Sequence, residues 1–170
     1  DAYFAALKAA GIRVKLDARD NQSPGFKFAE YELKGVPVRI AIGPRDVANG
    51  TVEVARRDTK EKQVMAETDL VHKIQHLLEQ IQHNLFQKAL DYRTEHITAV
   101  NNWDEFKDVL ENKTGFVSAH WDGTSETEQK IKEETKATIR CIPLNNHLEE
   151  GVCVYSGKAS TQRVLFAKAY

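Results

Sequence analysis

Residues 17–46 read DARDNQSPGFKFAEYELKGVPVRIAIGPRD. Turn-forming residues at Pro24-Gly25, Gly35 and Gly43-Pro44 divide this stretch into a segment with helical character, residues 26–34, and a strand, residues 37–42. A helix followed directly by a strand indicates an α/β unit. Acidic and basic side chains stand too close together here for a simple core, which favours a surface that recognises a polar ligand.

The sequence on either side extends this unit. Residues 1–10 have helical character and are expected to lead into a strand at 12–16, where Ile, Val and Leu alternate with Arg and Lys. Residues 51–56 predict another strand, with Asn49-Gly50 as the hairpin turn before it. We expect the first domain to cover residues 1–67.

A long run with apolar residues at helical spacing, residues 68–95, predicts a helix that links two domains, with Thr68 as its N-cap. Residues 96–170 predict a small α/β domain. Its expected elements are a short helix through Trp103 and Phe106 capped by Asn101 or Asn102, a strand at 115–118, a helix at 125–136 with Glu128 in a capping box, and strands at 138–142, 152–155 and 164–167. Its expected core contains Trp103, Phe106, Trp121, Ile131, Ile142 and Val164.

Composition excludes several classes of protein. A formal net charge of −1 and a pI near 6.7 argue against nonspecific coating of nucleic acid, so DNA is not an expected partner. No apolar run approaches the roughly 18 residues that span a bilayer, and no secretory signal is recognisable. With only two cysteines and no disulfide framework, the chain is predicted to be cytoplasmic with reduced thiols.

The charged side chains of residues 17–46 suit the recognition of base edges and phosphates. Carboxylates accept hydrogen bonds from guanine N–H groups, arginine donates a bidentate pair to guanine O6 and N7, and lysine suits phosphate. The alternative is that these residues form an exposed, salt-bridged loop region, and their spacing alone favours this interpretation. A rival function is a protein-interaction surface that docks a catalytic domain or a second subunit. No nucleophile, phosphate-binding loop or catalytic grouping is recognisable, so the chain itself is predicted to be non-catalytic.

Together with the chain end RVLFAKAY at 163–170, this stretch resembles the C-terminal part of prolyl-tRNA synthetases that carry an extra C-terminal domain. The segment KFAEYELKGVPVRIAIGPRD, residues 27–46, carries the resemblance. It implies an anticodon-binding domain with a mixed sheet, here without its first strand, followed by a zinc-binding-like domain. The implied parent enzyme is a homodimer that activates proline with ATP and Mg²⁺ and transfers it to tRNA(Pro). Its catalytic domain would lie outside this chain and be a partner of it.

The resemblance also implies which residues recognise the anticodon. Glu32, Arg39 and Arg45 match the family's recognition positions, although Arg45 stands where the family can have lysine. Glu32 would accept hydrogen bonds from guanine N1–H and N2–H₂, and the two arginines would donate to O6 and N7 or to phosphates. Lys27 and Asp46 are weaker candidates.

Three apolar side chains are expected to be buried. One face of the helix at 26–34 must pack, so Phe26 and Phe28 are predicted to lie in the core rather than to stack on bases. Cys141 follows a predicted strand and is expected to be a small buried hydrophobe.

The chain end keeps an apolar–polar alternation to its last residue, which favours a docked end. The resemblance implies that the carboxylate of Tyr170 reaches toward the catalytic domain. The alternative is an edge strand that only completes the local sheet.

The resemblance also raises the question of a metal site, because relatives of this type can hold a zinc ion with four cysteines, spaced C-x₄-C and C-x₂-C. The matching positions here are Asp122, Thr127, Cys153 and Ser156, so one thiolate remains of four. We therefore predict no zinc and no other cofactor in this chain. The alternative is that Asp122 and Cys153 belong to a working metal site in a catalytic C-terminal domain.

Overall fold

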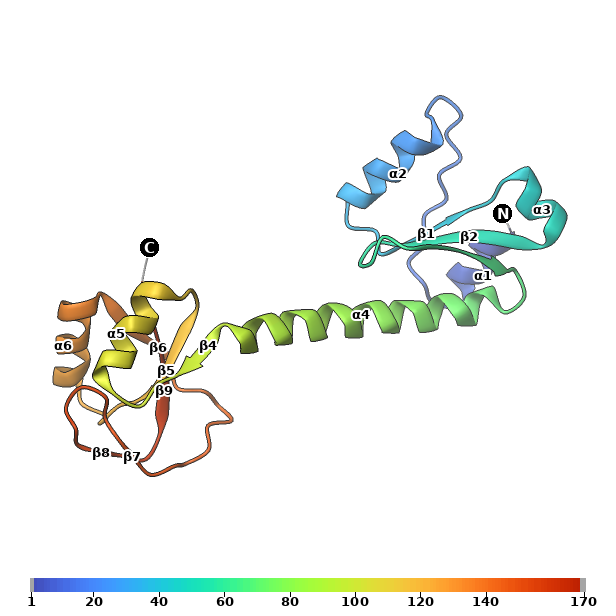
Figure 1. The fold of residues 1–170 in the computed structure, drawn as a ribbon. Helices are drawn as coiled ribbons and strands as arrows, with labels where there is room; N and C mark the ends of the chain where they lie inside the picture. Colours follow the sequence, from blue (N-terminus) through green and yellow to red (C-terminus); the bar gives the residue numbers. More distant parts are fainter. Residues whose placement is uncertain (1, 169–170) are drawn as a thin grey trace. The chain divides into compact units, whose positions relative to one another are not determined.

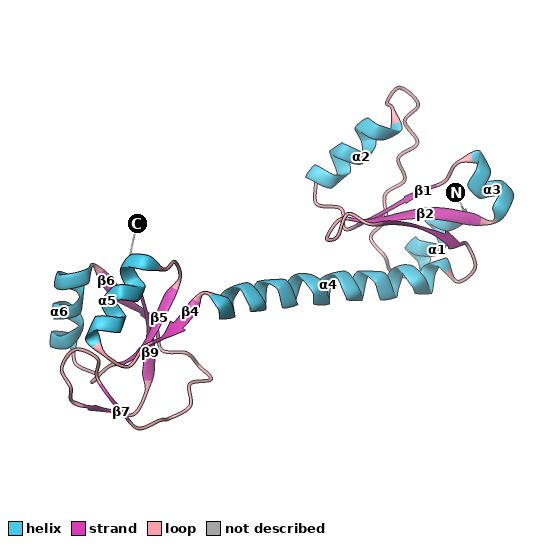
Figure 2. Cartoon of the chain, in the orientation of Figure 1, coloured by secondary structure: helices cyan, strands magenta, loops and turns pink. Residues whose placement is uncertain are grey.

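The computed structural model describes residues 2–168. The chain divides into two compact units, and the boundary along the sequence lies between Ala89 and Leu90. Both units contain helices and strands, which confirms the predicted α/β class (Figures 1 and 2). Within the described residues no helix is long and apolar enough to cross a membrane. Tyr170 lies outside the described residues, so its predicted role stays a prediction.

The first unit contains three strands and four helical segments. In order they are α1 (Ala2–Ala9), α2 (Pro24–Leu33), β1 (Val38–Ala41), α3 (Pro44–Asn49), β2 (Thr51–Arg56), β3 (Lys62–Ala66) and the N-terminal part of α4 (Leu70–Glu95). The strands form a sheet in the order β1-β2-β3, and both pairs are antiparallel.

The central strand β2 separates an apolar face of this sheet from a polar one. Val52 and Val54 are almost completely buried, at 0% and 1% exposure, and they pack with Leu7 of α1 and with the N-terminal half of α4. Because successive side chains of a strand point to opposite faces, Glu53 between them lies on the other face. The core thus fixes which side chains of the sheet remain for a ligand.

Several expectations for this unit were wrong. Residues 12–16 form no strand, although Ile12 and Val14 pack against the core as their alternation indicated. A strand needs a neighbouring backbone to bond with, and the order β1-β2-β3 does not include this segment. Because all pairs in this sheet are antiparallel, the mixed sheet expected for the domain is not found among the described residues of this unit.

The turns were also misassigned. Pro44 begins helix α3, whose C-cap is Gly50 in the left-handed conformation at φ 62°, so Asn49-Gly50 is a helix end rather than a hairpin turn. Strand β3 was missed because its side chains are mostly exposed and carry no alternation of burial. Helix α4 begins at Leu70, and Asp69, not Thr68, is the residue whose carbonyl accepts from Lys73 N–H.

The second unit contains the C-terminal part of α4 and eight further elements. These are β4 (Ile97–Ala99), α5 (Trp103–Asn112), β5 (Phe116–His120), α6 (Ser125–Thr135), β6 (Ala137–Cys141), β7 (Gly151–Val152), β8 (Ala159–Ser160) and β9 (Arg163–Lys168). A four-stranded sheet has the order β4-β5-β9-β6, in which only β4 and β5 are parallel, and β7 pairs with β8.

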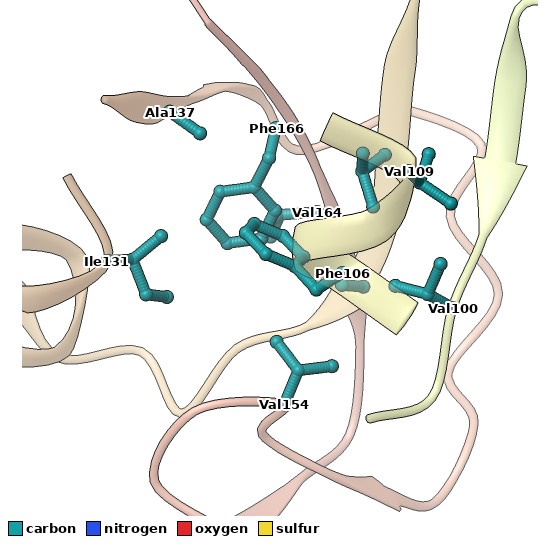
Figure 3. Packing of buried hydrophobic residues seen from close by; sticks show 10 residues of the cluster. Val100, Phe106, Val109, Ile131, Ala137, Val154, Val164 and Phe166 are labelled. Atoms are coloured by element: carbon teal, nitrogen blue, oxygen red, sulfur yellow. The ribbon is translucent and has the colours of Figure 1, made fainter. Parts of the chain in front are cut away.

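Aromatic packing holds the core of the second unit (Figure 3). Phe106 of α5 is fully buried and meets Phe166 of β9 edge to face, with ring centroids 5.1 Å apart. Trp103 stacks on Phe106 at 5.1 Å, and Ile131 brings α6 onto the same core. Such aromatic pairs add about 0.5–1.5 kcal/mol each beyond the area they bury.

Parts of the prediction for this unit were also wrong. Ile142 is 48% exposed and therefore outside the core, and Cys141 is exposed rather than buried. Both lie where strand β6 ends, so the alternation that would bury them does not continue. The N-cap of α6 is Thr124, one residue before Ser125, so Glu128 belongs to no capping box.

Candidate functional site

Arg39 of β1 and Glu53 of β2 define the polar face of the first unit. Two neighbouring side chains hold Arg39 in place. The Arg39 guanidinium lies 3.5 Å from the ring centroid of Phe28 on α2. Its Nη2 donates to Glu53 Oε1 at 3.3 Å, while its buried Nε has no partner among the described residues. A guanidinium stacked on a ring keeps a defined plane, so its remaining N–H donors have fixed directions.

Glu32 lies on α2 at the side of this surface and is accessible. Its side chain is 54% exposed, and Oε1 lies 3.6 Å from Lys60 Nζ. The backbone carbonyl of Glu32 accepts from Arg57 Nε at 2.9 Å, which ties the end of α2 to the end of β2. Because an exposed pair at this distance is weak, the carboxylate remains available to a ligand.

Arg45 and Asp46 both lie in the first turn of α3 but differ in their surroundings. Arg45 is exposed and has no ion pair within residues 2–168. Asp46 Oδ2 accepts from Gly43 N–H at 2.8 Å, and Oδ1 accepts from Thr51 Oγ1 at 3.3 Å. The Asp46 carboxylate therefore caps the helix that presents Arg45, which gives it a positioning role in the fold.

Lys27 faces the loop that precedes α2. Its Nζ donates to the carbonyl of Arg19 and lies 3.7 Å from Asp17 Oδ1. Hydrogen bonds from Arg19 hold the pKa of the Asp17 carboxyl well below its usual range. Lys27 is thus already engaged in holding this loop against α2.

The two phenylalanines of α2 are not core residues. Phe26 is 53% exposed, so its predicted burial was wrong. Phe28 is half-buried, but it packs under Arg39 and belongs to neither core cluster. Helix α2 has no buried residue because the apolar face of the sheet is already covered by α1 and α4.

The predicted residues do not form one bonded cluster. Within the described residues, no hydrogen bond or ion pair joins Glu32, Arg39 and Arg45 to each other; they come from α2, β1 and α3, respectively. Sequence reasoning missed Glu53, the residue bonded to Arg39. The alternation Val52-Glu53-Val54 could have indicated it, since a single acid between two buried valines must point to the other face.

In the second unit, a carboxylate hub brings together three of the four positions that the resemblance matched to zinc ligands, Asp122, Thr127 and Ser156. Oδ1 of Asp122 accepts from Thr124 N–H at 3.1 Å and from Thr124 Oγ1 at 2.8 Å. Oδ2 accepts from Thr127 Oγ1 at 2.8 Å and from Ser156 Oγ at 2.7 Å. Burial raises the pKa of Asp122, but the hydrogen bonds from Ser156, Thr127 and Thr124 outweigh burial and lower it to about 2. The fourth position, Cys153, is 1% exposed.

Two family models match the chain. One is described as the anticodon binding domain and covers residues 2–77. The other is described as prolyl-tRNA synthetase, C-terminal, and covers residues 103–170. The proline–tRNA ligase of Flavobacterium johnsoniae is 63% identical over 166 residues, which are 98% of this chain. The chain belongs to the prolyl-tRNA synthetase family.

Other prolyl-tRNA synthetases match over the same extent. The proline–tRNA ligase of Cytophaga hutchinsonii is 59% identical over 98% of this chain, and that of Porphyromonas gingivalis is 58% identical over 97%. The chain spans about a third of the length of these relatives, 34% and 33% respectively. The polar face lies within the residues matched by the anticodon-binding model, and the carboxylate hub lies within those matched by the C-terminal model.

Proposed function

We propose that the polar face recognises the anticodon of tRNA(Pro), with Arg39 as its central residue. The observation that carries this proposal is the stacked and partly buried guanidinium, which lies 3.5 Å over Phe28 and bonds to Glu53. A surface arginine that serves only solubility has no reason to be fixed in this way. An oriented guanidinium suits the fork geometry by which arginine recognises guanine.

The other residues of the face have separate roles in this proposal. The exposed carboxylate of Glu32 accepts from the Watson–Crick edge of a guanine, and Arg45 at the start of α3 contacts phosphate or a second base. Glu53 is a positioning residue, because it acts by holding the guanidinium of Arg39. Asp46 and Lys27 act indirectly, since their own contacts hold α3 and the loop before α2.

We also propose that this surface serves an aminoacyl-tRNA ligase that activates proline with ATP and Mg²⁺ and transfers it to tRNA(Pro). The support is the relatives that are named proline–tRNA ligase and are 58–63% identical to the chain. Catalysis, the ATP and proline sites and homodimerisation are assigned to the parts of such a protein beyond this chain. A cytoplasmic location follows from the same proposal.

The test is binding of the chain to a proline anticodon stem-loop and to the same RNA in which the two guanines that proline anticodons share are both replaced. We expect replacement of one recognised guanine to cost about 1–3 kcal/mol, which is about 5- to 150-fold in Kd. Arg39→Ala should remove this difference. Arg39→Lys keeps the charge but not the fork, so it should lose guanine discrimination while the salt dependence of binding stays the same.

Two variants make the test specific. Glu53→Gln should reduce discrimination part-way, because Arg39 keeps Phe28 but loses its charged partner. Arg140→Ala removes a positive charge from an exposed residue of the second unit and should leave discrimination unchanged. Equal affinity for both RNAs in the unmodified chain, or no binding at all, would refute anticodon recognition and favour a surface that docks another protein domain.

A further inference from the structure

We propose that the second unit is closed by the carboxylate hub, without a metal ion, at the place where relatives of this type are expected to hold zinc. The hub consists of Asp122, Thr124, Thr127 and Ser156. It joins the start of α6 to the loop between β7 and β8, two segments 34 residues apart in the sequence. A hydrogen-bonded side chain thus makes the connection that a bound ion would otherwise make.

The Asp122 carboxylate has no acceptor position to spare for a metal ion. An ionised carboxylate offers about four lone-pair sites. Two donors reach Oδ1, both from Thr124, and two reach Oδ2, from Thr127 and Ser156. A metal ion at this carboxylate would have to displace donors at 2.7–2.8 Å.

Two of the four side chains at these positions are not zinc ligands at neutral pH. Zinc in structural sites is bound by thiolate, imidazole or carboxylate. Thr127 and Ser156 are hydroxyls that keep their protons at neutral pH and here use them to donate to Asp122. Cys153 is the sole thiol among the four positions, and its Sγ makes no hydrogen bond within residues 2–168.

The hub is also part of the surrounding hydrogen-bonded fold. Thr124 is at once a hub donor and the N-cap of α6, because its Oγ1 accepts from Thr127 N–H at 3.3 Å. In the other segment, Cys153 N–H donates to Lys158 O at 2.8 Å and Cys153 O accepts from Gly157 N–H at 3.0 Å. This backbone bonding closes a turn that presents Ser156 to Asp122.

Further contacts hold the same junction by protein groups alone. Val154 N–H donates to His120 O at 3.2 Å and places its side chain in the core. Ser160 Oγ donates to Trp121 O at 2.8 Å. The junction between β5, α6 and the β7–β8 loop is thus bonded on both sides of Asp122. Cys153 contributes there as a small buried apolar residue.

The first experiment uses the unmodified chain. Protein produced in medium with added Zn²⁺ and purified without chelator should contain far less than one equivalent of zinc by elemental mass spectrometry. A strong chelator should leave the unfolding midpoint of the second unit unchanged; the two tryptophans, Trp103 and Trp121, both lie in that unit and report on it by fluorescence. One equivalent of retained zinc, or a midpoint that falls with chelator, would overturn the proposal.

Two variants test the hub itself. Asp122→Asn replaces one carboxylate oxygen, which accepts two hydrogen bonds, by an amide NH₂ group that can only donate. The folded-to-unfolded ratio of the second unit should therefore fall by about tenfold or more. Asp104→Asn makes the same change at a side chain that is 94% exposed and should leave the ratio nearly unchanged. If Asp122→Asn were as stable as Asp104→Asn, the hub would not close the unit.

A combined variant tests whether the four positions converge. Asp122→Cys, Thr127→Cys and Ser156→Cys, together with the native Cys153, should bind about one equivalent of Zn²⁺ added alone, and its unfolding midpoint should then fall with chelator. A combined variant that binds no Zn²⁺ would contradict the geometry on which the proposal rests.

Discussion

Replacing Asp58 by asparagine should destabilise the first unit. The Asp58 side chain is 1% exposed, and its two carboxylate oxygens accept from Arg56 Nε at 2.8 Å and Arg56 Nη2 at 2.6 Å. Oδ2 also accepts from Asn84 Nδ2 of α4 at 2.8 Å. Asp58 thereby ties the connection between β2 and β3 to the helix that covers the apolar face.

The expected loss follows from these contacts. Asparagine at position 58 would place an amide donor against the donors of Arg56 or Asn84 and leave the guanidinium without its charge partner. Breaking a buried ion pair by removing one partner costs about 3–5 kcal/mol. Since the Arg56 side chain keeps 17% exposure, water compensates part of this loss, and we expect about 2–3 kcal/mol.

The loss should depend on pH in a defined direction. Hydrogen bonds from Arg56 hold the pKa of Asp58 well below the value of about 3.9 for an unfolded chain. A lowered folded-state pKa stabilises fully above the unfolded pKa and loses its effect as pH falls toward the folded pKa. The difference between Asp58→Asn and the unmodified chain should therefore be constant above about pH 5 and shrink below about pH 4.

Hydrogen exchange measured by peptide is the suitable assay, because tryptophan fluorescence reports only on the second unit. Peptides of β2 should exchange about 30- to 150-fold faster in Asp58→Asn, while second-unit peptides serve as an internal reference. Asp20→Asn, at an exposed loop position of the same unit, is the matched control. Unchanged β2 protection, or a difference that grows below pH 4, would refute this account of Asp58.

Two further changes have defined expectations in the second unit. Gly115→Ala should cost about 3 kcal/mol or more, because φ is +113° and a Cβ there would lie 2.2 Å from His96 O; Gly123→Ala, with φ +78° and no atom within 4 Å, should cost about 1 kcal/mol. Equal midpoints for the two glycine variants in denaturant, followed by tryptophan fluorescence, would contradict the steric argument. Asn102→Ala should cost about 1 kcal/mol, since its Oδ1 accepts from Glu105 N–H at 2.9 Å as the N-cap of α5. Asn112→Ala at the other end of α5 should change the midpoint by less than about 0.5 kcal/mol, and a larger effect there than at Asn102 would argue against the cap.

Local signals in the sequence were sufficient for some elements. Helix α5 begins after Asn102, one of its two expected caps, and β2 covers Thr51–Arg56 as predicted. The apolar–polar alternation at 12–16 indicated the buried side chains but not the absence of a strand. Pairing depends on a distant neighbour, which no local pattern contains.

The candidate site was predictable in part for a similar reason. The resemblance supplied Glu32, Arg39 and Arg45, but their contacts required the structure. Glu53 meets Arg39 only through the pairing of β1 with β2, and Asp46 turned out to cap α3. From the sequence, the hub could be predicted only as a set of positions that keep one of four zinc-binding thiolates. Its hydrogen bonds depend on a turn more than 30 residues away.

The alternation of β2 couples folding to selectivity. Neighbouring positions of this strand serve the core and the proposed anticodon-binding surface, so a substitution at Glu53 should alter the proposed recognition while Val52 and Val54 keep the unit folded. A single inserted or deleted residue would be different, because a shift by one position exchanges the two faces. Such a chain would bury a carboxylate and expose two valines. Point substitutions are therefore the evolutionary route by which this surface can change its specificity. Insertions and deletions within the strand cannot do so, because they exchange its two faces.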